Sequence, residues 1–410
     1  MKVTLFTILF FSISTIRFAA AQDSGTNGIK FEHGSFAELK AKAVLEKKPI
    51  FIDAFTTWCG PCKWMSKTIF TQEKVGDFYN QNFVNAKIDM EKGEGIELAT
   101  RFGVQAYPTL LFVDAEGNIQ HRSVGAREGD SFIELGKQAI NPELNLVGLS
   151  AKFKSNPASY DVAYKYMAAL KDAYSQDSKD QKTVFDSYFA TQEKATWIEQ
   201  RNWRMLFDFA RNPQNPVFLN MKENRALFST RYSADSVDSK LKEVYYDQIQ
   251  SAAYQQDIPV WEETKKTIES LQLKGSDRVV ALTTIPLAGE NPVAICSNTF
   301  DFMNQFGTKD ARELNQFAWR VYEISTDKKQ LLAAESWAKQ ATEIEPADPM
   351  IADTYAALLF KNGKKSLAKA QAEKAISLGK TAGADMSGTV ELLAKIKDSL
   401  KPKPAPKGKK

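Results

Sequence analysis

Two cysteines separated by two residues, Cys59 and Cys62, are the residues of this chain best suited to chemistry. They follow an apolar run, FIDAF, that carries a single acid, Asp53, six residues before the first cysteine. A disulfide across two intervening residues closes a very small ring, so it adds little stability and is typical of reversible thiol chemistry. Burying a carboxylate in an apolar strand is costly unless its proton has a use. The spacing therefore predicts a redox pair with an acid beside it.

The cysteine count argues against a mechanical or metal-binding use of the pair. The chain of 410 residues has three cysteines, too few for a scaffold stapled by disulfides. A structural zinc site needs four ligands, and the two histidines, His33 and His121, do not form a ligand pair. We therefore expect no metal and no cofactor. The third cysteine, Cys296, is expected to be a small buried apolar side chain.

The residues around the pair predict alternating helices and strands. The first expected elements are a helix opened by a capping box at 35–38 and running to about 46, and a buried strand at 50–55. A second helix is expected to begin near Cys59, with Pro61 in its first turn, and to break near Thr71. The remaining elements are a strand at 82–90, a helix at 95–103, a hairpin at 109–124 turning at 116–118, and a helix at 131–140 capped by Asp130. This order predicts a mixed sheet with helices on both faces.

Residues 31 to about 141 resemble the thioredoxin superfamily. The resemblance is carried by WCGPCK at 58–63, by Asp53, by Tyr-Pro-Thr at 107–109 with the hairpin that follows, and by Val-Gly-Ala at 124–126. The run CKWMSKTIF, followed by KVGDFYNQNFVNAKID, is also similar to the envelope branch that includes the C-terminal domain of DsbD. This resemblance implies an α/β thioredoxin fold and a thiol–disulfide oxidoreductase whose substrates are protein thiols and disulfides.

The resemblance also implies roles for three residues. Cys59, at a helix N-terminus that favours a thiolate, is expected to attack a substrate disulfide, and Cys62 to resolve the mixed disulfide. Asp53 is expected to accept the proton of Cys62, with a pKa that burial raises toward neutrality. The alternative for Asp53 is a strand-end carboxylate that faces solvent or caps the turn.

Substrate binding is expected at the residues around the cysteines. Pro108 corresponds to the proline of the family that is cis and leaves backbone groups free to pair with an extended substrate. A trans proline that begins a strand is the alternative. The expected substrate-binding residues are Trp58, Gly60, Pro61, Tyr107, Pro108 and Thr109.

Two departures from the family affect this transfer. Thioredoxins have a lysine near the buried acid, and counting back from Asp89 places Asn85 at that position. Lys87 has the same strand parity as Asn85 and is a candidate substitute. Phe55 stands where thioredoxin has a tryptophan, whereas Trp58 is retained.

The direction of electron flow is predicted from the residues between the cysteines. Gly60 and Pro61 match reducing thioredoxins, and no histidine stands between the cysteines to stabilise the thiolate further. We therefore expect a reductant, supplied with electrons by a DsbD-like membrane donor that the family implies. A disulfide isomerase or oxidant with the same site is the alternative.

The termini predict export. Residues 1–21 have a cation, an apolar run and an Ala-rich end, which is typical of a cleaved signal peptide, and no later segment is apolar enough to span a membrane. The net charge of +4 includes two cations in this segment and five lysines in the last ten residues. Without them, the rest of the chain has a net charge of 4 − 2 − 5 = −3. We therefore expect no basic surface for nucleic acid. We expect a periplasmic protein, or a secreted one, with a basic Lys/Pro tail at 399–410.

The rest of the chain is predicted to be helical. Long amphipathic stretches such as 159–174 and 201–212 replace the strand pattern beyond about residue 145. A repeat spaced by 34 residues relates Ala334, Ala338 and Ala341 to Ala368, Ala372 and Ala375, as in tetratricopeptide (TPR) units, although Lys380 stands at the closing proline. We divide the chain into a thioredoxin-like domain (22–145) and a helical domain with TPR-like repeats (146–398, clearest at 315–380).

The helical domain leaves two alternatives open. Its repeats could present a concave surface for a peptide or protein partner, or they could simply pack without a ligand. In the first case the whole chain could also be a TPR-type adaptor with a passive thioredoxin-like module. The complete set of Cys59, Cys62, Asp53 and Pro108 argues against a passive module.

Overall fold

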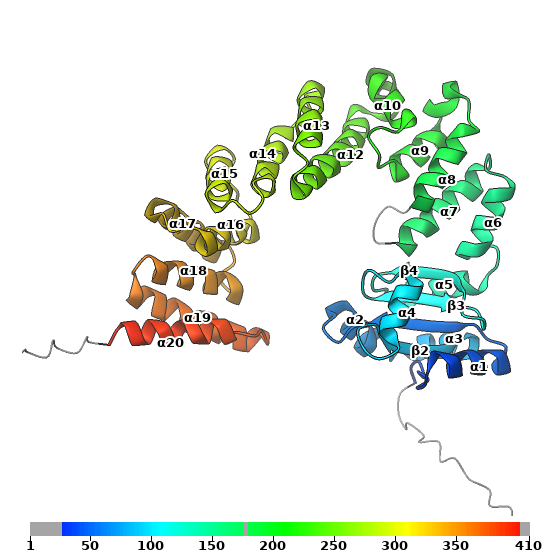
Figure 1. Cartoon of the computed structure of the whole chain (residues 1–410), viewed down its shortest axis with the longest axis horizontal. Coiled ribbons are helices and arrows are strands. Elements are labelled where there is room, and N and C mark those ends of the chain that lie inside the picture. Colours follow the sequence, from blue (N-terminus) through cyan, green and yellow to red (C-terminus); the bar gives the residue numbers. More distant parts are fainter. Residues whose placement is uncertain (1–26, 175–178, 402–410) are drawn as a thin grey trace, which may run out of the picture. The chain divides into compact units, whose positions relative to one another are not determined.

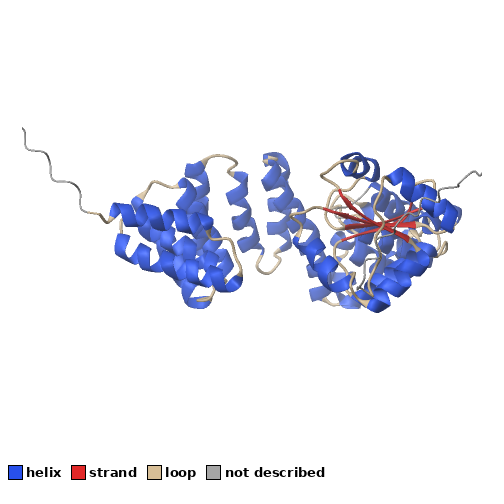
Figure 2. Cartoon of the chain, turned by 90° about the horizontal axis from the view of Figure 1, so that it is seen from below, coloured by secondary structure: helices blue, strands red, loops and turns tan. Residues whose placement is uncertain are grey.

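The computed structural model of the chain describes residues 27–174 and 179–401. These residues form two compact units that divide between Phe209 and Ala210, and each unit is described by itself. The strands belong to the first unit, and helices make up the rest (Figures 1 and 2). The predicted signal peptide (1–21) and nearly all of the predicted basic tail (402–410) lie outside the described residues.

A four-stranded mixed sheet forms the centre of the first unit. Its strands are β1 (Ile50–Phe55), β2 (Val84–Asp89), β3 (Thr109–Val113) and β4 (Ile119–Val124), in the order β2-β1-β3-β4. β1 runs parallel to β2 and antiparallel to β3, and β3 and β4 form the predicted hairpin. β1 is therefore a central strand, which agrees with its apolar residues on both faces.

Helices cover both faces of the sheet. They are α1 (Phe36–Glu46), α2 (Gly60–Trp64), the π-helix η1 (Met65–Ile69), α3 (Glu73–Asn82), α4 (Gly95–Phe102) and α5 (Gly129–Ile140). α1 and α4 pack on the face that carries Ile50 and Ile52, whereas η1, α3 and α5 pack on the face that carries Phe51. Since side chains alternate along a strand, Asp53 lies on the same face as Phe51. This face is the one covered by the segment that follows Cys62.

The predicted cap of the last helix of this region was wrong. α5 begins at Gly129 with Glu128 as its N-cap, so Asp130 lies in the first turn and does not cap it. The helix thus begins two residues earlier than expected, and a side chain at position 129 would meet the end of the Gln72 side chain. The Asp130 carboxylate instead pairs with Lys74 Nζ at 2.5 Å.

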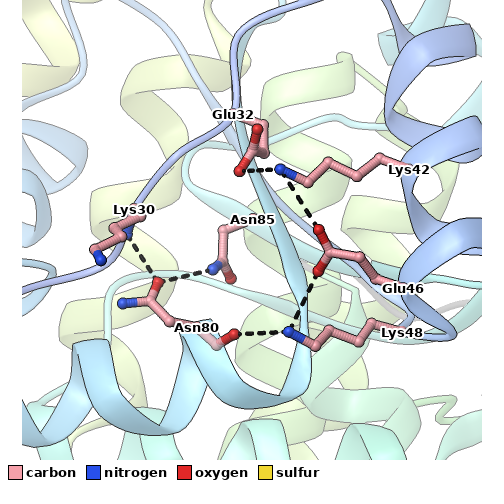
Figure 3. A network of polar contacts seen from close by, with 7 residues as sticks. All are labelled: Lys30, Glu32, Lys42, Glu46, Lys48, Asn80 and Asn85. Atoms are coloured by element: carbon pink, nitrogen blue, oxygen red, sulfur yellow. Dashed lines mark hydrogen bonds and ion pairs between the residues drawn. The ribbon is translucent and has the colours of Figure 1, made fainter. Parts of the chain in front are cut away.

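The segment that precedes α1 lies along the edge strand β2. Glu32 forms a single parallel bridge to Ala86, and the Asn80 side chain accepts from Lys30 N–H and donates to Gly28 C=O at 2.8 and 3.1 Å. Figure 3 shows the network of polar contacts that holds this edge, made by Lys30, Glu32, Lys42, Glu46, Lys48, Asn80 and Asn85. The β2 edge of the sheet is therefore covered by the segment before α1 and is not left open for pairing with another strand.

Further helices complete the first unit. They are α6 (Leu146–Ser155), α7 (Tyr160–Ala173), α8 (Lys179–Ala190), the 3-10 helix η2 (Lys194–Ile198) and α9 (Gln200–Phe209). α6 and α7 pack against β4, where the buried Arg122 donates to Phe102 C=O at 2.8 Å and its guanidinium lies 4.8 Å from the centre of the Tyr174 ring. The domain boundary predicted near residue 145 falls between α5 and α6.

The second unit consists of helices that pack in chain order. They are α10 (Pro216–Glu223), α11 (Arg225–Tyr232), α12 (Ala234–Gln255), α13 (Ile258–Leu271), α14 (Ser276–Leu287), α15 (Pro292–Gln305), α16 (Ala311–Ile324), α17 (Lys328–Ile344), α18 (Pro349–Lys361), α19 (Lys365–Ala382) and α20 (Ser387–Ser399). From α11 onward each helix contacts the next, as expected of a linear array. The helical class predicted for this region is confirmed.

The alanines of the predicted repeat pack against the helices next in the array. All of them are buried, on α17 and α19, and Gly363 makes the turn between α18 and α19 with a φ of 80°. The TPR character of these helices stays a prediction. Within the described ranges, no helix is long and apolar enough to cross a membrane.

Candidate active site

The two cysteines form a disulfide at the start of α2. Cys59 is the N-cap residue of this helix, Cys62 lies one turn further on, and their Cα atoms are 5.3 Å apart. The backbone N–H of Cys62 donates to Cys59 Sγ at 3.1 Å, and Pro61 occupies the first turn, where no N–H is needed. The two cysteines are 3% and 2% exposed, whereas Gly60 and Pro61 between them are exposed.

Asp53 is completely buried beneath this helix. Its side chain lies on the face of β1 that packs against η1, and neither carboxylate oxygen accepts a hydrogen bond from the described residues. Burial raises the pKa of Asp53 to about 6, although the positive charge of Lys87 acts in the opposite direction. The alternative of a solvent-facing or capping aspartate is therefore wrong.

The charged partner of Asp53 is Lys87. The two residues face each other in the parallel register of β1 and β2, and Lys87 Nζ lies 3.5 Å from Asp53 Oδ2. Asn85 instead lies opposite Phe51 and donates to Asn80 in the edge network (Figure 3). Lys87, the candidate that strand parity allowed, is therefore the lysine next to Asp53.

Aromatic rings and a hydroxyl surround the Lys87 ammonium. Nζ lies 4.7 Å from the centre of the Phe55 ring and 5.6 Å from that of Phe70, and it donates a hydrogen bond to Ser66 Oγ. Phe55, the second departure from the family, therefore contributes a cation–π contact to this site.

Ser66 also belongs to this site, although its sequence context does not single it out. The residue lies in η1, one helical turn after Cys62, and its hydroxyl donates to Cys62 C=O at 2.9 Å while it accepts from Lys87. A π-helix is a rare irregularity that is often found at functional sites. The available signal was the i, i+4 spacing of a serine behind the second cysteine, which is not specific.

Of the expected substrate-binding residues, Gly60 and Pro61 stand between the cysteines, and Trp58, which precedes Cys59, contacts Tyr107. The Tyr107–Pro108 peptide bond is cis, as expected, and Thr109, which begins β3, is buried and donates to Ala106 C=O at 2.7 Å. Trp58 is 64% exposed; its Nε1 donates to the Glu91 carboxylate at 2.9 Å, and its ring meets that of Tyr107 edge-on at 5.8 Å. An exposed tryptophan in ring contact with a half-buried tyrosine therefore stands next to Cys59.

The remaining cysteine lies in the second unit. Cys296 is buried in α15 among apolar residues such as Ala318 and Leu331, and burial raises the pKa of its thiol. This position confirms the prediction of a small buried side chain. In the part of the chain that the structure describes, no group of three or more His, Cys, Asp or Glu residues could hold a metal ion.

The fold and the cysteine pair define a thiol–disulfide oxidoreductase of the thioredoxin type. The thioredoxin family model matches residues 31–138. A thioredoxin-like protein of Synechocystis sp. is 33% identical over 106 residues, which are 26% of this chain and 92% of that protein. The thioredoxin of Borreliella burgdorferi is 39% identical over 21% of this chain and 68% of its own length. The chain belongs to the thioredoxin family.

Two further relatives show similarity over the same region. The thiol:disulfide interchange protein DsbD of Yersinia pestis is 32% identical over 18% of this chain and 13% of its own length. Among solved structures, a putative disulphide-isomerase from Bacteroides thetaiotaomicron is 46% identical over 29% of this chain and 98% of its own, with a TM-score of 0.27.

Proposed function

We propose that the chain is an exported oxidoreductase that reduces protein disulfides through Cys59 and Cys62. The observation that supports this best is the closed Cys59–Cys62 pair at the start of α2 above the fully buried Asp53. A carboxylate held in this environment has a pKa of about 6, close to the value at which a general base works well near neutral pH.

The reaction proceeds in two exchanges. The Cys59 thiolate, stabilised by the N–H of Cys62, attacks one sulfur of a substrate disulfide, forms a mixed disulfide and releases the first substrate thiolate. Cys62 then gives its proton to Asp53, attacks Cys59 Sγ and releases the second substrate thiolate. Two electrons pass from the dithiol to the substrate, and the Cys59–Cys62 disulfide remains.

Trp58, Tyr107, Pro108 and Thr109 hold the substrate in this proposal. The exposed ring of Trp58 and the ring of Tyr107 next to it offer apolar area beside the sulfur to be attacked. The backbone before β3 pairs with an extended substrate segment. Gly60 and Pro61, both exposed, let the substrate approach Cys59 without obstruction.

A reductant outside the cytoplasm needs an electron supply. Export rests on the sequence of residues 1–21, and the periplasm is the compartment we propose. The similarity to DsbD of Yersinia pestis supports a DsbD-like membrane donor that returns the pair to the dithiol form. The helical region is proposed to bind a peptide or protein partner.

An isomerase with the same site is the second candidate. It is favoured by similarity to protein disulfide-isomerases, such as that of Zea mays, which is 28% identical over 25% of this chain and 20% of its own length. The two activities differ in reduction potential, since reductants have the lower value.

Equilibration with glutathione buffers tests the proposal. Free thiols of the full chain are trapped by alkylation, with Cys59→Ser as control. A potential of about −270 mV supports the reductant, and one between about −180 and −120 mV supports the isomerase or oxidant. A pair that neither cycles nor reacts would leave only the adaptor, with a passive thioredoxin-like module.

A further inference from the structure

Ser66 connects the buried acid to the helix that carries the cysteines. Its hydroxyl accepts from Lys87 Nζ and donates to Cys62 C=O at 2.9 Å, while Nζ also lies 3.5 Å from Asp53 Oδ2. A continuous series of polar contacts therefore runs from Asp53 through Lys87 and Ser66 to the backbone of Cys62.

The distances show that Lys87 is shared between two acceptors. Charge-assisted hydrogen bonds between an ammonium and a carboxylate are about 2.7–2.9 Å long, so 3.5 Å is an ion pair without a close hydrogen bond. The shorter contact of Lys87 is the one to Ser66. Two aromatic faces, Phe55 and Phe70, flank the same ammonium.

We propose that Ser66 is a positioning residue that holds the Lys87 ammonium away from close contact with Asp53 and so keeps Asp53 basic enough to deprotonate Cys62. This inference rests on the proposed function. Without the hydroxyl, Lys87 keeps Asp53 Oδ2 as its ion-pair partner. Closer approach of the ammonium favours the charged carboxylate, which makes Asp53 a weaker base.

The charged groups around Asp53 are few. The positive charge that acts on it is that of Lys87 on β2, and β3 places the apolar Leu110 opposite it. On the covering helices, Lys63 and Lys67 are exposed, and the group that faces Lys87 is the uncharged Ser66. A change in pH dependence on altering Ser66 therefore has to act through Lys87 and Asp53.

The chain provides a matched control in the same π-helix. Thr68 donates to Trp64 C=O at 2.6 Å in the same i to i−4 manner as Ser66, but it is exposed. Thr68→Ala removes an equivalent hydroxyl from η1 and leaves Lys87 untouched. Ser66→Thr retains the hydroxyl that Lys87 needs.

The test follows the reduced full chain reacting with 5,5′-dithiobis(2-nitrobenzoate) in a stopped-flow instrument between pH 5 and 9. Attack by Cys59 releases the first thionitrobenzoate, and attack by Cys62 on the mixed disulfide releases the second. For Ser66→Ala we expect the second phase to slow about twofold to tenfold near pH 7.5, the range that one hydrogen bond is typically worth. The pH at which the rate of the second phase falls on the acid side should move to a lower value, while the rate of the first phase stays unchanged.

Further variants separate positioning from a structural effect. Ser66→Thr should restore the pH profile, and Ser66→Ala should add nothing in a Lys87→Met background, because Ser66 acts through Lys87. An unchanged second phase in Ser66→Ala, or an equal change in Thr68→Ala, would overturn the role of Ser66. A wild-type chain that never releases the second thionitrobenzoate would instead overturn the proposed function.

Discussion

Lys87 lies opposite Asp53 across the parallel pair of β1 and β2, with its Nζ 3.5 Å from Asp53 Oδ2. The carboxylate is fully buried, whereas the lysine side chain is 25% exposed. The pair is therefore asymmetric: burial raises the pKa of Asp53, and the lysine only partly offsets this effect. Several consequences of this asymmetry can be measured.

Replacing Asp53 should stabilise the fold at neutral pH. A carboxyl whose pKa rises to about 6 on folding contributes stability below about pH 4 that is lost as the pH rises through 6. Asp53→Asn removes this loss, so we expect β1 to gain about 1–3 kcal/mol of protection at pH 7 and almost nothing at pH 4. Hydrogen exchange of the amides of β1 at the two pH values measures the difference.

The comparison between wild type and Asp53→Asn controls for other groups that titrate in this pH range. His121 has its pKa lowered to about 4 by burial, so its contribution is lost as the pH falls through the same range and runs opposite to that of Asp53. Only the difference between wild type and Asp53→Asn isolates the acid. An equal gain at pH 4 and pH 7 would mean that the amide improves packing and that ionisation of Asp53 is irrelevant.

Replacing Lys87 should shift the pH profile of resolution upward. The positive charge of Lys87 favours the ionised carboxylate, so Lys87→Met should raise the pKa of Asp53 above about 6. The acid limb of the Cys62 step then moves to higher pH, opposite in direction to the shift expected for Ser66→Ala. The two-phase reaction with 5,5′-dithiobis(2-nitrobenzoate) measures it. A limb that moves down in Lys87→Met would show that Lys87 does not interact with Asp53 in solution.

The sequence predicted these contacts only in part. The elements of the thioredoxin region follow from local signals, such as the capping box at Ser35 and the glycine after α4, and both are confirmed. Strand parity allowed Lys87 as the partner of the acid, but only the register of two strands far apart in sequence distinguishes it from Asn85. Ser66 could not be found, because its contact with Lys87 depends on η1, whose π geometry has no clear local signature.

The division of labour between the cysteines predicts a trapping result. In Cys62→Ser, the mixed disulfide on Cys59 cannot be resolved, so substrate proteins should remain covalently attached and be released by dithiothreitol. Cys59→Ser should capture nothing. Cys296→Ser is the matched control and should behave as wild type, since Cys296 is buried and free. Capture by Cys59→Ser, with none by Cys62→Ser, would reverse the assigned roles.

The packing of α6 and α7 on β4 predicts that a thioredoxin region cut at the sequence boundary lacks part of its cover. His121 on β4 is buried with neither ring nitrogen hydrogen-bonded among the described residues, and Asp172 on α7 is close enough to affect its pKa. In a fragment that ends at residue 145, His121 should lose part of its burial, and its pKa should rise from about 4 toward the ordinary value of about 6.5. A fragment that ends at residue 209 should keep the low value. Titration of the imidazole signals by NMR compares the two fragments, and an unchanged pKa in the shorter one would show that α6 and α7 are not needed to bury β4.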